Sequence, residues 1–145
     1  SQDSNLKMKL EKSYTGMDKS RSNEYKDLFF DTYAFYEIIR ENKDYEKYLS
    51  FGIVTTKLNL FELYFGFLKD NNIDLAEKSL NKYYQFVVDF DEEVIKKAAK
   101  LKKELNKRDI SMTDSIGYTL AKQLGIKFLT GDSEFENLDN VEFVK

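Results

Sequence analysis

The sequence predicts an α/β domain built on a mostly parallel central sheet of four to five strands. Short apolar segments typical of buried strands alternate with longer segments of helical periodicity. This alternation is typical of strands joined by crossover helices, which produce a parallel sheet. With 145 residues, 41% hydrophobic and 34% charged, the chain has the size and composition of one domain with a substantial core.

The first 26 residues are polar and charged and carry few apolar side chains. We interpret residues 1–26 as a tail or arm, in part of artificial origin, and expect the compact domain to span 27–145. The chain shows no signal peptide and no apolar run near the ~18 residues that a membrane span requires. Cysteine is absent, which agrees with the cytoplasmic location that we expect.

Four short apolar segments predict strands, at 28–30, 86–88, 127–130 and 141–144. Between them, helical periodicity predicts helices at 32–49, 56–69, 74–84, 91–106 and 111–124. The apolar positions of the first helix are Phe35, Ile38, Ile39, Tyr45 and Leu49. Those of the second helix are Leu58, Phe61, Phe65 and Leu68.

Capping residues support the later helices. Asp74 is a suitable N-cap for the third helix, and Asp91 is one for the fourth, whose first turn is acidic and whose last turn carries lysines. Ser111 or Thr113 begins the fifth helix, and Gly125 ends it.

Four acids stand at unusual places in this pattern. Asp31 and Asp132 each follow a predicted strand, so we expect both at the carboxyl edge of the sheet, where parallel sheets bind ligands. Glu62 shares a helical face with apolar side chains, where an unpaired carboxylate is expensive to bury. Asp114 lies in the first turn of a helix that also begins at a strand edge.

Each acid also has a structural interpretation. Asp31 could be an N-cap, Asp114 a first-turn acid and Asp132 a turn residue, while Glu62 could reach water from the edge of its apolar stripe. None of the four has a lysine or arginine adjacent in sequence. Carboxylates gathered without cations repel one another, so a divalent cation is the natural partner of the set.

The composition limits the chemistry of such a site. The chain has no histidine and no cysteine, which excludes Ser-His-Asp and Cys-His nucleophiles and zinc sites with nitrogen or sulfur ligands. Its six glycines form no phosphate-binding loop. A metal would therefore bind to oxygen ligands, which favours Mg²⁺, Mn²⁺ or Ca²⁺.

The segments "LFFDTYAF", "LNLFELYFGF" and "MTDSIGYTLAKQLGIKFLTGDSEF" resemble the PIN-domain ribonucleases, especially the small VapC-type toxins of bacteria and archaea. The resemblance covers about residues 27–145. It implies a three-layer α/β/α domain that cleaves RNA with Mg²⁺ or Mn²⁺. The metal ligands of the family match Asp31, Glu62, Asp114 and Asp132, and its supporting hydroxyls match Thr32 and Thr130.

The resemblance also implies partners. Toxins of this family usually form homodimers and are inhibited by a cognate antitoxin, whose tail fills the acidic groove. The tail at 1–26 exceeds what the family needs, and the net charge of −3 leaves the RNA-binding surface undefined. Candidate RNA contacts are Lys26, Lys57, Lys69 and Lys122.

Within this hypothesis, a bound cation would lower the pKa of a water molecule and neutralise charge on the cleaved phosphate. Asp31 and Asp114 are expected as direct ligands, and Glu62 as a ligand or as the base that orients the water. Asp132 is expected to hold a second metal or to support the first. Thr32 and Thr130 would orient ligands or the phosphate.

Two other functions remain open. A phosphatase of the haloacid dehalogenase type also places Asp after its first strand, but it needs a second Asp where this chain has Tyr33. A PIN-like module without catalysis, used for protein binding, is the other alternative.

Two surface features add to these hypotheses. The segment 95–108 is expected to be an exposed, lysine-rich helical face, and contact with phosphates is an alternative use of it. More aromatic residues occur than one small core needs, so some are expected at an interface, from among Tyr33, Phe35, Tyr36, Phe61, Tyr64, Phe65 and Phe67.

Overall fold

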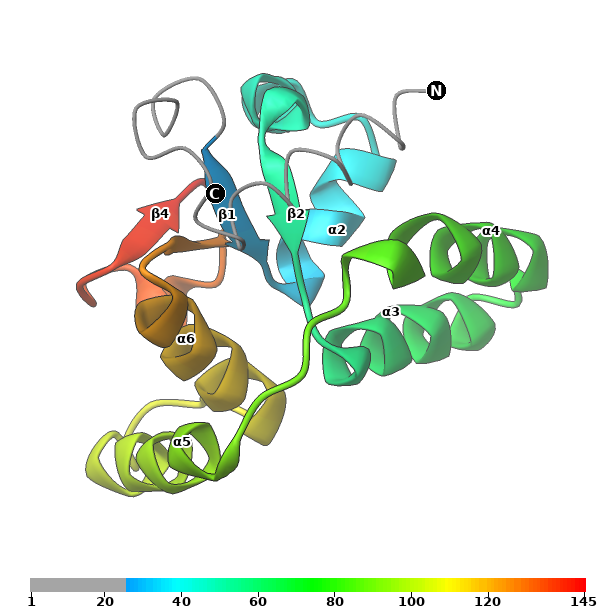
Figure 1. Cartoon of the computed structure of the whole chain (residues 1–145). Helices are drawn as coiled ribbons and strands as arrows, with labels where there is room; N and C mark the ends of the chain where they lie inside the picture. The colour runs from blue at the N-terminus through cyan, green and yellow to red at the C-terminus, as the bar shows by residue number, and fades with distance from the viewer. Residues whose placement is uncertain (1–25) are drawn as a thin grey trace.

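A computed structural model describes residues 26–145. Its four strands form one sheet in the order β2-β1-β3-β4, and every neighbouring pair is parallel. The strands are β1 (Asp27–Phe30), β2 (Gly52–Val54), β3 (Lys127–Thr130) and β4 (Val141–Phe143). The predicted three-layer α/β/α class is confirmed, because helices cover both faces of this sheet (Figure 1).

Within residues 26–145, the α-helices are α2 (Thr32–Ile39), α3 (Lys57–Lys69), α4 (Ile73–Tyr83), α5 (Glu92–Glu104) and α6 (Met112–Leu124). The same part of the chain contains the 3₁₀ segments η2 (Lys43–Ser50), η3 (Tyr84–Phe86) and η4 (Ser133–Phe135). The N-caps predicted for α5 and α6 are confirmed at Asp91 and Ser111. Gly125 ends α6 with φ of 72°, a left-handed conformation that favours glycine.

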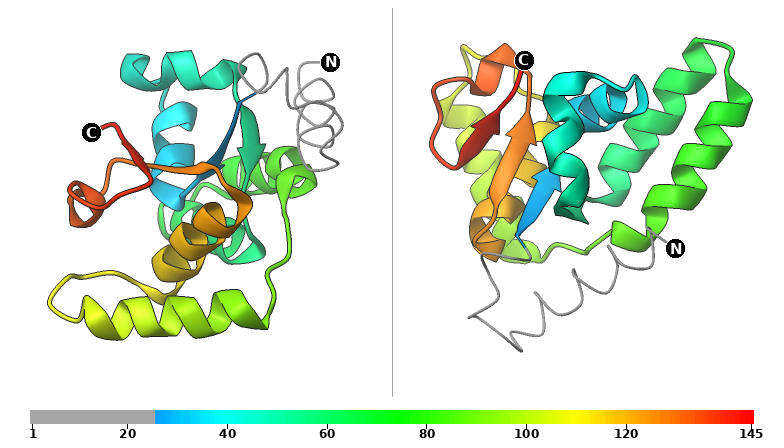
Figure 2. Two further views of the ribbon diagram at one scale, coloured as in Figure 1. Left: turned by 60° about the vertical axis from the view of Figure 1, so that its left-hand side comes forward. Right: turned by 90° about the horizontal axis from the view of Figure 1, so that it is seen from above.

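Alternate side chains of the strands point to the two helical layers. Phe29 and Phe128 stack at 5.6 Å and face α6, whose Gly117 lies against them. A Cβ at Gly117 would come within 2.8 Å of the Phe29 ring, so glycine allows α6 to pack closely on the sheet. On the other face, Phe30 packs against Phe35 of α2 at 5.7 Å. Helix α5 lies along the outside of α6 (Figure 2).

The single helix expected over 32–49 is wrong, because the chain turns after α2. Glu41 takes a left-handed φ of 62°, and the side chain of Asn42 then caps η2. The 3₁₀ helix buries Tyr45 and Tyr48, which are three residues apart, and leaves Leu49 exposed. The apolar positions of this segment therefore follow a period of three rather than the α-helical period.

Three other features differ from the prediction. The short strand β2 was not predicted, while the expected strand at 86–88 is η3 followed by one bridge between Val87 and Thr55. Helix α4 is capped by Asn72, whose side chain accepts from the N–H of Leu75 at 3.2 Å, and not by Asp74.

The apolar stripe predicted for α3 is also wrong in part. The helix buries Leu60, Leu63 and Phe67, whereas Phe61 is 70% exposed and Phe65 is 52% exposed. Helix α3 is apolar on most of its circumference, so its periodicity alone did not select the face that packs on α2 and α4. Two of the aromatic residues expected at an interface are thus at the surface, and Phe35 is fully buried.

Candidate active site

Asp31 is the first residue after β1 and is only 2% exposed. Its Oδ1 accepts a 2.8 Å hydrogen bond from the N–H of Ala34, which makes it the N-cap of α2. The structural interpretation of Asp31 is therefore correct, and the carboxyl group lies at the carboxyl edge of the sheet, where a ligand would bind.

The electrostatic environment of Asp31 is unfavourable to a negative charge. Burial is the main cause, and it raises the pKa of this carboxyl group from 3.8 to about 8. The Thr130 hydroxyl and the Ala34 N–H lower this pKa, while the charges of Asp114 and Asp132 raise it further. The structure thus brings three of the predicted acids within electrostatic reach of one another.

Asp114 lies in the first turn of α6 and forms a capping box with Ser111, the N-cap residue of this helix. The Ser111 N–H donates to Oδ2 of Asp114 at 3.1 Å, and the Asp114 N–H donates to Oγ of Ser111 at 3.1 Å. Burial raises the pKa of Asp114, the two bonds with Ser111 lower it, and the charges of Glu62 and Asp132 raise it. Asp114 is therefore a helix-start residue and a neighbour of the other acids at once.

Asp132 follows β3 and caps η4 through a 3.0 Å bond from the Glu134 N–H to its Oδ1. Its own N–H donates to Oγ1 of Thr130 at 3.0 Å. Thr130 is fully buried, so this bond anchors the turn on which Asp132 lies. The turn role considered for Asp132 is correct, and its charge still acts on Asp31 and Asp114.

Glu62 is half-buried on α3 and is held by a chain of hydrogen bonds. Thr32 donates from Oγ1 to Oε1 of Glu62 at 2.7 Å. Asn59 donates from Nδ2 to the Thr32 hydroxyl at 3.3 Å and accepts from Oγ1 of Thr56 at 2.7 Å. These contacts fix the Glu62 carboxylate against the start of α2, and its charge acts on Asp114.

Asn59 was not predicted as a site residue from the sequence. It is buried, and its hydrogen bond to the Thr32 hydroxyl orients that side chain. The available signal was a polar residue three positions before Glu62 in an otherwise apolar helix, which places both side chains on neighbouring parts of one face.

The four candidate lysines lie on separate parts of the fold. Lys26 precedes β1 and therefore lies at the opposite edge of the sheet from Asp31. Lys57 and Lys69 are the first and last residues of α3, and Lys122 is in the last turn of α6. Within residues 26–145, the ion pairs are Arg40–Glu37 and Lys122–Asp139, and neither includes one of the four acids.

The donor set fits a hard divalent cation in its chemistry. All four side chains supply carboxylate oxygens, and the carboxyl groups of Asp31 and Asp114, whose pKa is raised by burial and by the charges of other acids, would gain from a bound positive charge. Among the described residues, no three acids are yet close enough together to hold a metal ion jointly.

Ligand sites at the carboxyl ends of parallel strands occur in many α/β domains, so the position of this site does not by itself identify a family. The PIN domain family matches residues 28–141, and the chain belongs to this family, whose members are generally nucleases. No curated protein sequence matches the chain.

A solved structure supports the fold. A toxin-antitoxin complex from Klebsiella pneumoniae superposes with a TM-score of 0.63 at 14% identity, covering 80% of this chain and 96% of that one. Within the described residues, no helix combines the length and apolar character that crossing a membrane requires.

Proposed function

We propose that this protein is an endoribonuclease that depends on Mg²⁺ or Mn²⁺ and hydrolyses RNA at the acid cluster Asp31, Glu62, Asp114 and Asp132. The observation that carries the proposal is the buried Asp31 carboxyl group, whose pKa is raised by burial and by the charges of two acids from other segments. Such an arrangement costs stability, and strongly perturbed pKa values cluster at functional sites. Membership in a family of nucleases supplies the reaction class.

The residues have distinct roles in this proposal. Asp31 and Asp114 hold the cation, Glu62 is a further ligand or the base that orients the attacking water, and Asp132 holds a second cation or supports the first. When bound, a divalent cation supplies an acidified water and neutralises charge on the scissile phosphate.

The hydroxyl groups position these acids. Thr32 directs one oxygen of Glu62 through its 2.7 Å hydrogen bond, and Thr130 stabilises the ionised form of Asp31. Burial around Asp31 excludes water from one side of the cluster, which strengthens the attraction between a cation and its ligands.

The test is cleavage of a mixed pool of single-stranded RNA with Mg²⁺, with Mn²⁺ or with chelator, followed by mapping of the new ends. We expect cleavage with either metal, no cleavage in chelator, and products with a 5′-phosphate and a 3′-hydroxyl, because water is the nucleophile. A 2′,3′-cyclic phosphate would show attack by the ribose hydroxyl instead. Absence of cleavage under every condition would favour a protein-binding module without catalysis.

We further propose that the protein is the toxin of a toxin–antitoxin pair and acts in the cytoplasm. A solved structure with a similar fold is a toxin–antitoxin complex, which supports an antitoxin partner for this chain. Expression of the parent chain should arrest cell growth, and expression of Glu62→Gln should not. Normal growth with an active ribonuclease would remove the toxin role and leave the nuclease proposal standing.

We also propose a homodimer, formed through the exposed apolar side chains of α3. Phe61 and Phe65 stack with a centroid distance of 6.1 Å, and Leu68 extends the same face. Apolar surface of this kind is typical of association. Sedimentation should show a dimer for the parent and a monomer for Phe61→Ser with Phe65→Ser, whereas Tyr84→Ser, which removes an aromatic side chain that is 53% exposed, should stay dimeric.

The catalytic domain that we propose spans 27–145, with 1–26 as an accessory tail. Most of that tail lies outside the described residues. A chain that lacks residues 1–25 should cleave the same RNA pool at a rate close to that of the full chain. Loss of cleavage in the shortened chain, with its fold intact, would place part of the site in the tail.

A further inference from the structure

We propose that the groove between α5 and α6 binds the phosphate backbone of the single-stranded RNA substrate beside the acid cluster. This inference rests on the proposed ribonuclease function and assigns a surface to the substrate. The groove is defined by its lining, which includes Lys97 and Lys100 from α5 and Tyr118, Thr119 and Lys122 from α6. Its volume is about 450 Å³.

The charge of this region differs from that of the whole chain. Residues 92–108, which contain α5, carry seven lysine and arginine side chains against three glutamates, while the chain as a whole has a net charge of −3. One of the glutamates, Glu104, also lines the groove. A cationic surface on an acidic protein is the expected footprint of local phosphate binding.

The two groove lysines of α5 are available for a ligand. Lys97 and Lys100 are exposed, and neither forms an ion pair with any of the residues 26–145 that the structure describes. Lys122 is positioned differently, because its Nζ lies 3.0 Å from Oδ2 of Asp139. The groove therefore offers two cations that can follow a flexible backbone and one that is held in place.

The groove begins close to the acid cluster. Helix α6 carries Asp114 in its first turn and Tyr118 and Lys122 one and two turns later, about 6 and 12 Å along the helix axis. The end of α5 meets the start of α6, since Lys102 donates from Nζ to the Ile110 carbonyl at 2.7 Å. A strand that crosses the acids can continue along the groove, whose cations are too far from Asp114 to pair with it.

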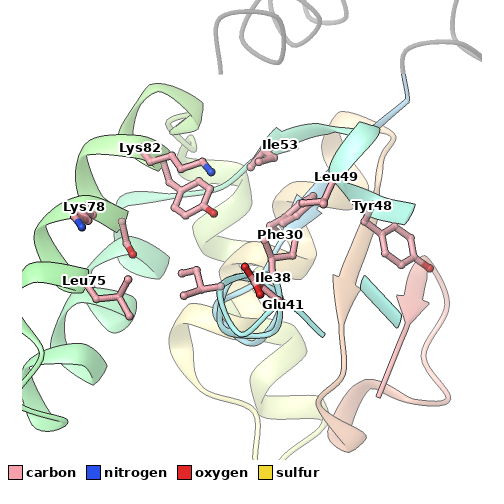
Figure 3. A pocket seen from close by; sticks show the side chains of 12 residues that line it. Phe30, Ile38, Glu41, Tyr48, Leu49, Ile53, Leu75, Lys78 and Lys82 are labelled. Carbon is pink, nitrogen blue, oxygen red and sulfur yellow. The ribbon is translucent and has the colours of Figure 1, made fainter. Parts of the chain in front are cut away.

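The lining favours RNA over a protein segment. A groove that binds a protein has an apolar centre, whereas phosphates are bound mainly by lysine and other polar side chains. The exposed side chains of this lining are charged or polar, while Tyr118 is buried and donates its hydroxyl to Asp139. The only aliphatic side chain in the lining is that of Leu101. By contrast, a cavity of about 400 Å³ between α2, η2, β2 and α4 is lined by Phe30, Ile38, Ile53 and Leu75 (Figure 3).

This second cavity provides a matched control, because two exposed lysines of α4, Lys78 and Lys82, line it as well (Figure 3). The double variant Lys97→Ala with Lys100→Ala and the double variant Lys78→Ala with Lys82→Ala change the net charge equally. All four side chains are exposed, so both variants should fold. Any difference between them reports the position of the charges and not their number.

The experiment measures binding of a fluorescein-labelled single-stranded RNA of mixed sequence to the full chain in chelator, by anisotropy, between 50 and 300 mM KCl. Each phosphate contact with a single strand contributes about 0.7 to the slope of log K against log salt concentration. The groove variant should lose about 1.4 from this slope and bind at least about tenfold more weakly, while the control variant should match the parent. In Mg²⁺, the groove variant should raise KM for cleavage and leave kcat near the parental value.

Equal losses in both double variants would overturn the proposal, since they would reflect net charge alone. An unchanged slope and KM in the groove variant, with normal cleavage by the parent, would also overturn it while the ribonuclease function stands. If the groove variant binds RNA normally but loses its antitoxin, the groove is a protein site. Failure of the parent to bind or cleave any RNA would remove both the groove proposal and the proposed function.

Discussion

The hydroxyl of Thr32 donates a 2.7 Å hydrogen bond to Oε1 of Glu62, and this bond joins the first residue of α2 to the middle of α3. Asn59 donates to the same hydroxyl from Nδ2 at 3.3 Å. Thr32 therefore acts as donor to the acid and acceptor from the amide, which fixes the direction of its O–H. Glu62 is held at the start of α2 by a contact that an apolar residue at position 32 cannot make.

Thr32→Val should reduce the cleavage rate by about 10- to 100-fold, because side chains that orient a metal ligand have effects of that size. It also leaves the Asn59 amide without its acceptor, at a cost of about 1–3 kcal/mol in stability. Thr32→Ser keeps the hydroxyl and should restore most of the rate. The Mn²⁺ concentration for half-maximal cleavage should rise in Thr32→Val, a shift that a purely structural role would not cause.

Glu62→Gln should lower the cleavage rate by orders of magnitude while the melting temperature stays close to that of the parent. The amide oxygen of glutamine can still accept from Thr32, so the local structure persists, but the charge is lost. Turnover of a short RNA and a melting curve on the same sample provide the measurement. If Glu62 only ends an apolar stripe, Glu62→Gln would be fully active.

Asp114→Asn should abolish cleavage and yet melt at the same or a higher temperature than the parent in chelator. The substitution removes one charge from a cluster in which Glu62 and Asp132 raise the pKa of Asp114. Relief of this repulsion should stabilise the fold by about 1 kcal/mol. Loss of a negative charge from the first turn of the helix should destabilise it by only about a few tenths of a kcal/mol. The asparagine oxygen can still accept from the Ser111 N–H.

Mg²⁺ should raise the melting temperature of the parent and raise that of Asp114→Asn less, because binding to the folded state alone stabilises it. Ser111→Ala is the control, since it removes the capping hydroxyl and keeps the charge. It should melt lower than the parent in chelator and retain its response to Mg²⁺. A clearly lower melting temperature for Asp114→Asn in chelator would mean that Asp114 is mainly a helix-start residue.

The stability of the metal-free protein should fall as the pH rises from about 4 to about 8. The folded protein holds the proton of Asp31 up to a pKa of about 8, whereas the unfolded chain releases it near 3.8. Between these values the folded state binds more protons, so unfolding becomes easier by up to about 1.4 kcal/mol per pH unit. Urea unfolding in chelator at several pH values measures this slope.

Asp31→Asn should flatten that pH dependence, because asparagine does not titrate. Mg²⁺ should oppose the loss of stability in the parent above pH 7, since a cation favours the ionised carboxylate. A parent protein whose stability is constant from pH 4 to pH 8 in chelator would show that Asp31 ionises normally in the folded state.

Strong local signals explain which elements could be predicted. Helices α5 and α6 have N-caps, and α6 also has a terminal glycine, so both were predicted nearly to the residue. Strand β2 has only three residues, and its pairing with β1 depends on contacts distant in sequence. The turn at Glu41 gives no local signal, because glutamate is not a residue that favours a left-handed φ.

The acids of the site were predictable because strands that run in parallel end at one edge, so Asp31 and Asp132 had to lie near each other. The orientation of Glu62 could not be predicted, because α3 is apolar on most of its surface. The helix buries the face that carries Leu63 and Phe67. The positions of the groove lysines Lys97, Lys100 and Lys122 depend on how α5 packs on α6, and the hydrophobic periodicity of the sequence does not specify this packing.

Asp31 is the N-cap of α2, and the charges of other acids act on it. Asparagine caps helices as well as aspartate does, and one base change converts an aspartate codon into an asparagine codon. A single point mutation can therefore silence this domain without unfolding it. Inactive copies of the gene would then still produce a protein with the parental surface, which would compete with the active form for the antitoxin that we propose.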